Sequence, residues 1–286
     1  MGAHAVSRLL RDRRAAFGVV VLGVMVLLAA AAPLVTTGAP TVQRDVAATR
    51  FLPPLAIDQH RVLHPLGTDR FGRDVWTRLV YGARISLSVS GLAVLLSVVL
   101  GVAVGAAAGY AAGGLSAVLL GVTDFALALP RVVLLLLLAS LWQPSTTLVI
   151  VVLGLTGWMT VARLVYGEVR TLAVRPFVEG AIALGARRGR VLWRHILPNA
   201  VTPVIVAAAL GVGNAILLEA GLSFLGLGVQ PPAASWGNMI ASGRDTLVNA
   251  PWIAAAPGVA LVLAVVACAL LGDALRDQLA AERGRR

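Results

Sequence analysis

Two ionisable side chains, Asp124 and Arg131, stand inside a long apolar stretch of the sequence, with Pro130 between them. An ionisable group at membrane depth costs a few kcal/mol, so such groups usually face a helix bundle or an aqueous path. A separation of seven residues places both on one helix face, but about 10 Å apart along its axis, which disfavours a direct ion pair. Three alternatives stay open: pairing with groups elsewhere, lining a translocation path, or a position at the membrane interface for one of them.

A second segment with chemical character, residues 174–198, is polar and lies between two apolar runs. Pro176 suits the first turn of a helix, Glu179 complements the positive N-terminal end, and Gly185 ends or bends the helix. A short apolar stripe is predicted from Phe177, Ala181 and Leu184. The basic residues that follow are Arg187, Arg188, Arg190 and Arg194. A short amphipathic helix held outside the membrane has the form of a docking element for a partner, but it could also lie in the membrane interface, and both alternatives stay open.

The sequence holds no evident catalytic or metal-binding group of residues. The close pair His60 and His64 lacks clustered carboxylates, and no Ser or Cys nucleophile has an obvious base. Cys268 is the single cysteine and excludes an internal disulfide. The chain has no lysine, so it cannot form a P-loop of the type that needs Lys at the nucleotide phosphates. We therefore expect no catalytic residue, metal or cofactor on this chain.

The elements that position these residues are membrane helices. The 286-residue chain is 58% apolar and 13% charged, against about 45–50% and 25% in soluble domains. Apolar runs of about 18 residues or more can cross the bilayer as helices. Six such spans are predicted, at residues 17–35, 86–111, 115–141, 146–164, 202–219 and 252–271. The first run is too long for the apolar core of a signal peptide and is expected to be retained. Residues 221–232, rich in glycine and proline, are expected to form a re-entrant or interfacial segment.

The net charge of +11 comes from arginines that flank the apolar runs. Nucleic-acid binding would need a basic soluble module, so no nucleic-acid partner is expected. Arginine gathers on the cytoplasmic side of membrane proteins, and the bias here favours both termini in the cytoplasm. The first outer loop is also rich in arginine, but four aspartates offset much of its charge.

Two further helical patterns are predicted. Residues 67–84 have the pattern of an amphipathic interfacial helix, in which Asp69 with Arg73 and Asp74 with Arg78 form i,i+4 pairs. In the second apolar run, small residues repeat at every fourth position and favour close helix packing within this chain or with a partner chain. They are Gly101, Gly105 and Gly109.

The 174–198 segment resembles the E-A-A loop of binding-protein-dependent ABC importer permeases. The shared residues are Glu179, Gly180, Ala181, Gly185, Leu197 and Pro198. The sequence from His195 to Asn199 narrows the resemblance to the dipeptide/oligopeptide/nickel permease family, as do residues 67–84, 222–232, 235–238 and 271–277. The N-terminal anchor helix resembles the C-type subunit of the permease pair. The chain departs from the pattern at three positions: Gly180 replaces an alanine, Tyr166 a basic residue, and Arg131 a small or apolar residue.

The resemblance implies an all-α integral membrane protein of the cytoplasmic (inner) membrane, with six transmembrane helices in a type I ABC importer bundle. It implies a B-type permease partner, two cytoplasmic ATPase subunits that use ATP and Mg, and an extracytoplasmic solute-binding protein. The ATPase-coupling loop would comprise Glu179, Gly180, Ala181, Gly185, Arg187, Arg188, Arg190, His195 and Pro198. The expected solute is a dipeptide, an oligopeptide or a related small solute such as nickel.

The expected organisation has four parts. Residues 1–66 hold the cytoplasmic N-terminus, the anchor helix and an outer loop, and residues 67–85 hold the interfacial helix. Residues 86–275 form the permease domain with its coupling loop at 165–200, and residues 276–286 form a cytoplasmic tail. Two other classes of protein would need different features. An ion-coupled carrier or channel would use Asp124 and Arg131 as its coupling site but has no use for a docking loop, and a membrane enzyme would need convergent catalytic groups.

Overall fold

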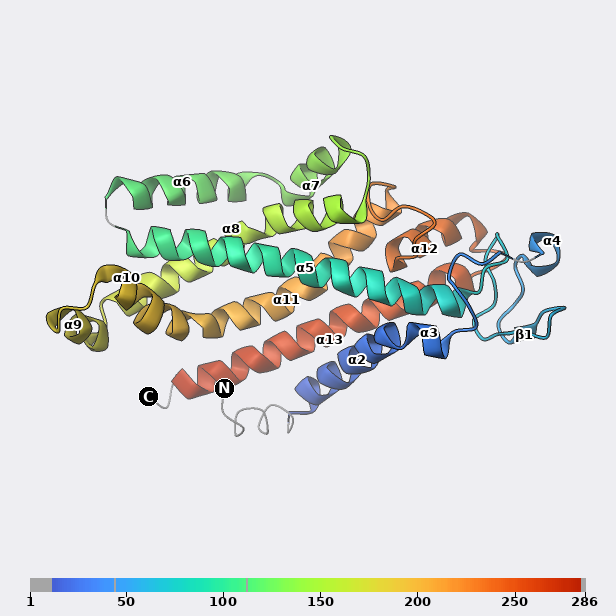
Figure 1. Ribbon diagram of the computed structural model, residues 1–286, viewed down its shortest axis with the longest axis horizontal. Coiled ribbons are helices and arrows are strands. Elements are labelled where there is room, and N and C mark those ends of the chain that lie inside the picture. The colour runs from blue at the N-terminus through green and yellow to red at the C-terminus, as the bar shows by residue number, and fades with distance from the viewer. Residues whose placement is uncertain (1–11, 44, 112, 284–286) are drawn as a thin grey trace.

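The computed structural model describes residues 12–43, 45–111 and 113–283 of the chain. Arg8, Arg11, Arg44, Arg285 and Arg286, which enter the expected charge bias, lie outside the described residues. The fold is a bundle of long helices that run side by side (Figure 1). The long helices are α2 (Arg13–Ala30), α5 (Val75–Tyr110), α8 (Thr146–Ala173), α11 (Leu197–Phe224) and α13 (Trp252–Arg283). All five are long and apolar enough to cross a membrane.

The third expected span is a broken one. It consists of α6 (Gly114–Ala128) and α7 (Arg131–Ser140), which meet at an angle of 88°. Leu129, which precedes Pro130, has an extended backbone (ψ 135°), because the proline ring disfavours helical geometry in the residue before it. With this pair counted as one span, the six expected spans are confirmed. The expectation of a continuous helix over 115–141 is wrong.

The expected separate helix at 67–85 is also not formed. Asp74 caps α5 by accepting a hydrogen bond from the Thr77 N–H at 2.7 Å, and the helix continues from Val75 to Tyr110 without a break. Gly67 and Gly72 have positive φ values of 73° and 70°, which favour a turn over a helix.

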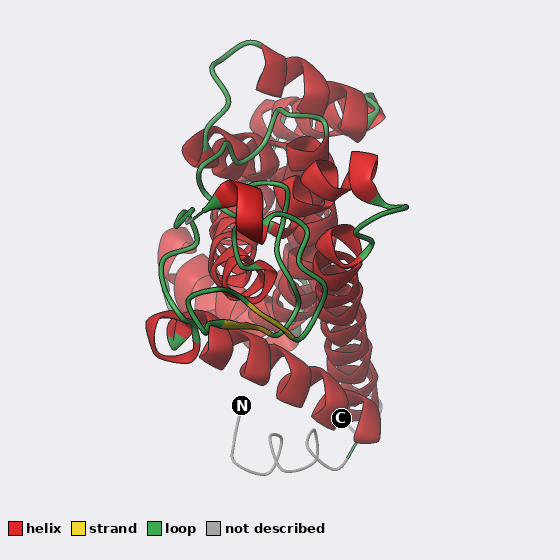
Figure 2. Cartoon of the chain, turned by 90° about the vertical axis from the view of Figure 1, so that its right-hand side faces the viewer, coloured by secondary structure: helices red, strands yellow, loops and turns green. Residues whose placement is uncertain are grey.

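The bundle has two chemically different ends (Figure 1). One carries α9 (Pro176–Ala183), α10 (Arg188–Val191) and the π-helix η1 (Leu192–Ile196). The opposite end carries an outer head, which we define as residues 32–74, with α3 (Ala32–Val35), α4 (Val46–Thr49), β1 (Ala56–Ile57) and β2 (Leu63–His64). The two strands are antiparallel, with Ala56 opposite His64. Figure 2 looks onto this end. The start of α2 and the end of α13 lie away from the outer head (Figure 1), consistent with cytoplasmic termini.

The core of the bundle depends on close contact between α5 and α8. A Cβ atom added to Gly101 would lie 2.5 Å from Val161 Cβ and 2.8 Å from the Trp158 carbonyl oxygen. Gly105 and Gly109 meet α8 in the same way, at Ala162 and Val169. The glycine stripe therefore packs within this chain. At the outer end, α12 (Trp236–Gly243) and the short 3-10 helix η2 (Arg244–Thr246) precede α13, and Trp236 is buried among α5, α11 and α13.

Candidate functional site

The segment that resembles the E-A-A loop folds as a corner of short helices, α9 and α10. Pro176 is the first residue of α9, and Glu179 lies exposed in its first turn. The helix ends at Ala183, and Gly185, two residues further on, has a φ of +81°. The Gly185 N–H donates to the Ile182 carbonyl at 2.9 Å, and the Ala186 N–H donates to the Ala181 carbonyl at 3.0 Å. This is a Schellman C-cap, which glycine fits best because it has no Cβ.

Apolar contacts hold this corner on the bundle. Val178 of α9 and Val191 of α10 are fully buried and share one cluster with Ile196, Val165 and Val169. These shared apolar contacts join α9 and α10 to α8 and α11.

The opposite face of the corner is exposed and combines apolar and basic residues. Leu184 is 91% exposed and Trp193 is 72% exposed. Other exposed residues of the corner include Phe177, Ile182, Arg187, Arg188, Arg190 and Arg194, and Gly180 is exposed with open space around it. Of the predicted stripe, only Ala181 is partly buried, so Phe177 and Leu184 face outward rather than toward this chain. Large exposed apolar patches with a charged rim mark interaction sites.

The link from this corner to α11 contains a π-helix that sequence reasoning missed. Residues Leu192–Ile196 form it, and His195, half-buried, accepts a hydrogen bond from Asn199 Nδ2 at its carbonyl oxygen, at 2.7 Å. Pro198, exposed in the first turn of α11, has no N–H to donate. Proline after an apolar helical run was the only signal, and it marks a local irregularity without specifying its type.

Asp124 and Arg131 are not brought together. Asp124 Oδ1 lies 3.1 Å from Arg163 Nη2 of α8, with both side chains about half exposed, at 46% and 48%. Of the three alternatives for these residues, the structure shows the first for Asp124, which pairs with a side chain of another helix. The coupling site that an ion-coupled carrier would need is not assembled.

Arg131 is the first residue of α7 and lies at the break in the third span. Its side chain lines a cavity of about 360 Å³ that it shares with Ser97, Gly157 and Asn214. Its Nε atom is buried and has no hydrogen-bond partner.

Glu219, a buried carboxylate in α11, escaped sequence reasoning. It is fully buried, and it accepts hydrogen bonds from Ser86 Oγ at 2.9 Å and Ser223 Oγ at 2.7 Å. These hydroxyls in turn accept the backbone N–H groups of Trp236 at 3.2 Å and Val229 at 3.1 Å. One carboxylate thus connects α5 and α11 with Val229, in the middle of the loop before α12, and with Trp236, the first residue of α12. The sequence does carry a signal, because Glu219 is an acidic residue at the end of the fifth predicted apolar run.

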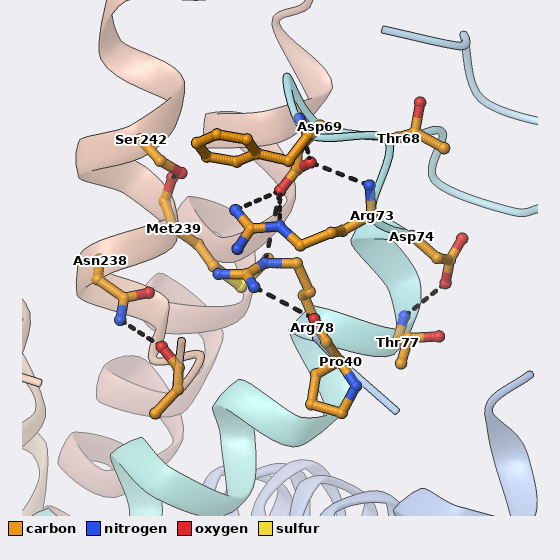
Figure 3. A network of polar contacts seen from close by, with 12 residues as sticks. Pro40, Thr68, Asp69, Arg73, Asp74, Thr77, Arg78, Asn238, Met239 and Ser242 are labelled. Atoms are coloured by element: carbon orange, nitrogen blue, oxygen red, sulfur yellow. Dashed lines mark hydrogen bonds and ion pairs between the residues drawn. The ribbon is translucent and has the colours of Figure 1, made fainter. Parts of the chain in front are cut away.

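The outer head contains a buried ionic network (Figure 3). Asp69 Oδ2 lies 2.7 Å from Arg73 Nη2 and 3.7 Å from Arg78 Nε, so the expected Asp69–Arg73 pair is present. The expected Asp74–Arg78 pair is replaced, because Asp74 caps α5 and its Oδ1 lies 2.9 Å from His64 Nδ1.

Asp58 lies on the other side of His64, with Oδ2 3.6 Å from His64 Nε2. Burial raises the pKa of Asp58, but the backbone N–H groups of Val62 and His60 together with His64 outweigh this and hold that pKa below its ordinary value. His60 is exposed and does not join His64 in a site. Among the described residues, no three His, Cys, Asp or Glu side chains are arranged to hold a metal ion.

Bundle, broken span and exposed corner together define a polytopic membrane transport subunit, and comparison with known proteins identifies its family. Residues 97–284 match the family described as "Binding-protein-dependent transport system inner membrane component", and residues 1–54 match the "N-terminal TM domain of oligopeptide transport permease C". The chain belongs to this family of inner-membrane permeases.

Its relatives include a putative peptide permease protein of Brucella suis, 41% identical over 277 residues that cover 96% of this chain and 89% of the relative. The dipeptide transport system permease protein DppC of Alkalihalophilus pseudofirmus is 35% identical over 276 residues, covering 96% and 88%. Among solved structures, an inward-facing MetNI methionine ABC transporter is similar with a TM-score of 0.57 and 20% identity, covering 70% of this chain and 96% of that one. This likeness confirms the fold.

Family membership and the apolar helices make the chain a multi-pass protein of the inner membrane and a transport subunit. The family operates with ATPase and binding-protein components. An enzyme or an ion-coupled carrier is therefore not the correct class.

Proposed function

We propose that this chain is the C-type permease subunit of an ATP-driven importer of dipeptides or oligopeptides. Its partners would be a B-type permease, two ATPase subunits and an external solute-binding protein. ATP and Mg would be used by the ATPase subunits, and this chain would bind no cofactor. The peptide specificity is supported by the names of relatives at 35–41% identity over nearly the whole chain.

The observation that carries the proposal is the corner formed by α9 and α10. Its inner face is buried on α8 and α11, and its outer face exposes Leu184, Trp193 and three arginines, Arg187, Arg188 and Arg190. An ATPase bound to the outer face would displace α8 and α11 when it closes, because the corner cannot move without its buried cluster. Glu179 would orient α9, and the arginines would contact acidic groups of the ATPase.

The substitution Gly185→Asp tests this proposal. It forces a side chain into a left-handed backbone conformation and puts a negative charge beside the arginines. We expect the ATPase subunits to be lost on purification in mild detergent, and uptake of alanyl-alanine by the reconstituted transporter to fall at least tenfold.

Gly180→Ala is the matched control. Gly180 is also in the corner, but its surroundings are open, and alanine favours a helix over glycine by about 1 kcal/mol. This variant should keep the ATPase subunits and transport. Retention of both by Gly185→Asp would show that the corner is not the docking element.

A further inference from the structure

The cavity at Arg131 is built from four membrane elements. Ser97 comes from α5, Arg131 from α7, Gly157 and Thr160 from α8, and Asn214 from α11. At 1.5 Å per residue, Gly157 lies about 17 Å and Asn214 about 15 Å from the outer ends of their helices, which places the cavity near the middle of a bilayer core of about 30 Å. A volume of about 360 Å³ is within the range of pockets that hold small molecules.

The guanidinium in this cavity has no ionic partner among the described residues. No described carboxylate lies within 4.0 Å of it, and Asp124, the acidic residue nearest in sequence, is paired with Arg163 instead. Its Nε is buried without a hydrogen-bond partner. A cation at mid-membrane depth is costly when it is uncompensated, so an anionic group in the cavity would be stabilised there.

The other polar groups of the cavity are neutral and suit the rest of a polar solute. Thr160 and Asn214 are exposed within this single chain, so their side chains remain available. Ser97 is already engaged, since its hydroxyl donates to the Gly154 carbonyl at 3.0 Å. A carboxylate from a packed neighbouring helix would neutralise the arginine but would not need this additional space. Broken membrane helices, such as α6 with α7, commonly form solute sites where they are interrupted.

We propose that Arg131 binds the carboxylate of the solute during translocation, so that the permease itself recognises an anionic group at mid-membrane. This rests on the proposed import of peptides, which carry a C-terminal carboxylate. The guanidinium matches a carboxylate with two parallel hydrogen bonds.

The test measures the charge preference of the cavity at a reporter cysteine that is the only cysteine of this chain. In a Cys268→Ala background, Thr160→Cys is introduced, and the complete transporter is placed in nanodiscs of phosphatidylcholine, which has no net charge. The reaction rates of an anionic thiosulfonate (2-sulfonatoethyl) and a cationic one (2-trimethylammonioethyl) are compared. Val174→Cys, at an exposed position in the cytoplasmic loop, is the matched control.

We expect Arg131→Gln to lower the ratio of anionic to cationic rates at Thr160→Cys by at least about fivefold and to leave the ratio at Val174→Cys unchanged. Arg131→Lys should keep the preference. Alanyl-alanine should protect Thr160→Cys from modification in the wild-type background, and alanyl-alaninamide, which lacks the carboxylate, should not.

A ratio that Arg131→Gln does not change would overturn the proposal, because a carboxylate of the partner permease would then already neutralise the guanidinium. Equal protection by the dipeptide and its amide would overturn it as well. ATP-dependent uptake of alanyl-alanine tests the proposed function separately. If uptake occurs but Thr160→Cys shows no charge preference, the Arg131 site is rejected and the proposed function stands.

Discussion

At the scale of single residues, Glu219 shows how one buried carboxylate organises its surroundings. Each serine that donates to it has a single hydroxyl hydrogen, and each serine oxygen already accepts a backbone N–H. The glutamate is therefore the acceptor that allows Ser86 to hold Trp236 at the start of α12, and Ser223 to hold Val229 in the loop before it. A buried polar group left without its partner costs about 1–3 kcal/mol.

We expect Glu219→Leu to destabilise the purified protein by about 2 kcal/mol and to expose residues 225–235 to protease. Thermal unfolding and limited proteolysis in detergent measure both effects. Ser90→Ala is the control, because the Ser90 hydroxyl is buried without a partner and its removal leaves nothing unsatisfied. Equal melting temperatures for wild type and Glu219→Leu would show that the hydrogen-bond network contributes nothing to stability.

At the scale of elements, the pairing of α5 with α8 sets the geometry of the bundle. In lipid there is no hydrophobic force between helices, so close backbone approach and van der Waals packing favour association. The glycines of α5 permit that approach at three successive turns, where carbonyl oxygens and valine side chains of α8 occupy the space a Cβ would need. In the third span, the chain bends by 88° at Pro130. The bend directs Arg131 toward the bundle, whereas a straight helix would carry it further along the axis of α6.

Gly101→Ala separates packing from helix propensity. Alanine favours the helix by about 1 kcal/mol, but the added methyl would meet Val161 at 2.5 Å, and overpacking costs about 1–3 kcal/mol. We expect a net loss of stability, read as a lower melting temperature. Gly91→Ala, in the same helix with open space around it, should be neutral or stabilising. A Gly101→Ala variant as stable as Gly91→Ala would mean that the two helices can separate without cost.

At the scale of the whole molecule, the two ends are held together by different chemistry. The cytoplasmic corner depends on buried valine and isoleucine side chains, whereas the outer head depends on Asp69 with its two arginines and on His64 with its two aspartates. Trp252 of α13 also ties the head to the bundle by donating from Nε1 to the Thr68 carbonyl at 3.2 Å. Acid should therefore loosen the outer end first.

The pKa of Asp58 sets the direction of this effect. Because that pKa lies below its ordinary value of 3.8, the carboxylate stabilises the folded head at all pH values above about 4. The stabilisation is lost as the pH falls through the lowered pKa. We expect protease sensitivity of residues 55–64 to rise below about pH 4 while α9 and α10 stay protected, and Asp58→Asn to show the same sensitivity already at pH 7. Unchanged protection of the head in Asp58→Asn would contradict this.

The sequence by itself determined the class of the protein and most of its elements. Apolar length is a local property, so six spans could be counted, and fixed spacings such as Glu179 to Gly185 to Pro198 identified the corner and its family. Gly185 and Pro176 could be assigned as helix ends because their backbone preferences are local too.

Only the tertiary structure decided which polar groups meet. Two such pairs join different helices: Asp124 with Arg163, and Glu219 with Ser86. The periodicity of one helix does not specify how a neighbouring helix is rotated about its axis or how far it is shifted along it. The break at Pro130 has the same consequence, because the bend removes Asp124 and Arg131 from the common face that a straight helix would give them. Because a charge inside a membrane is costly, the sequence alone indicates that Arg131 needs a partner. Only the packing of four elements shows that Arg131 lines a cavity.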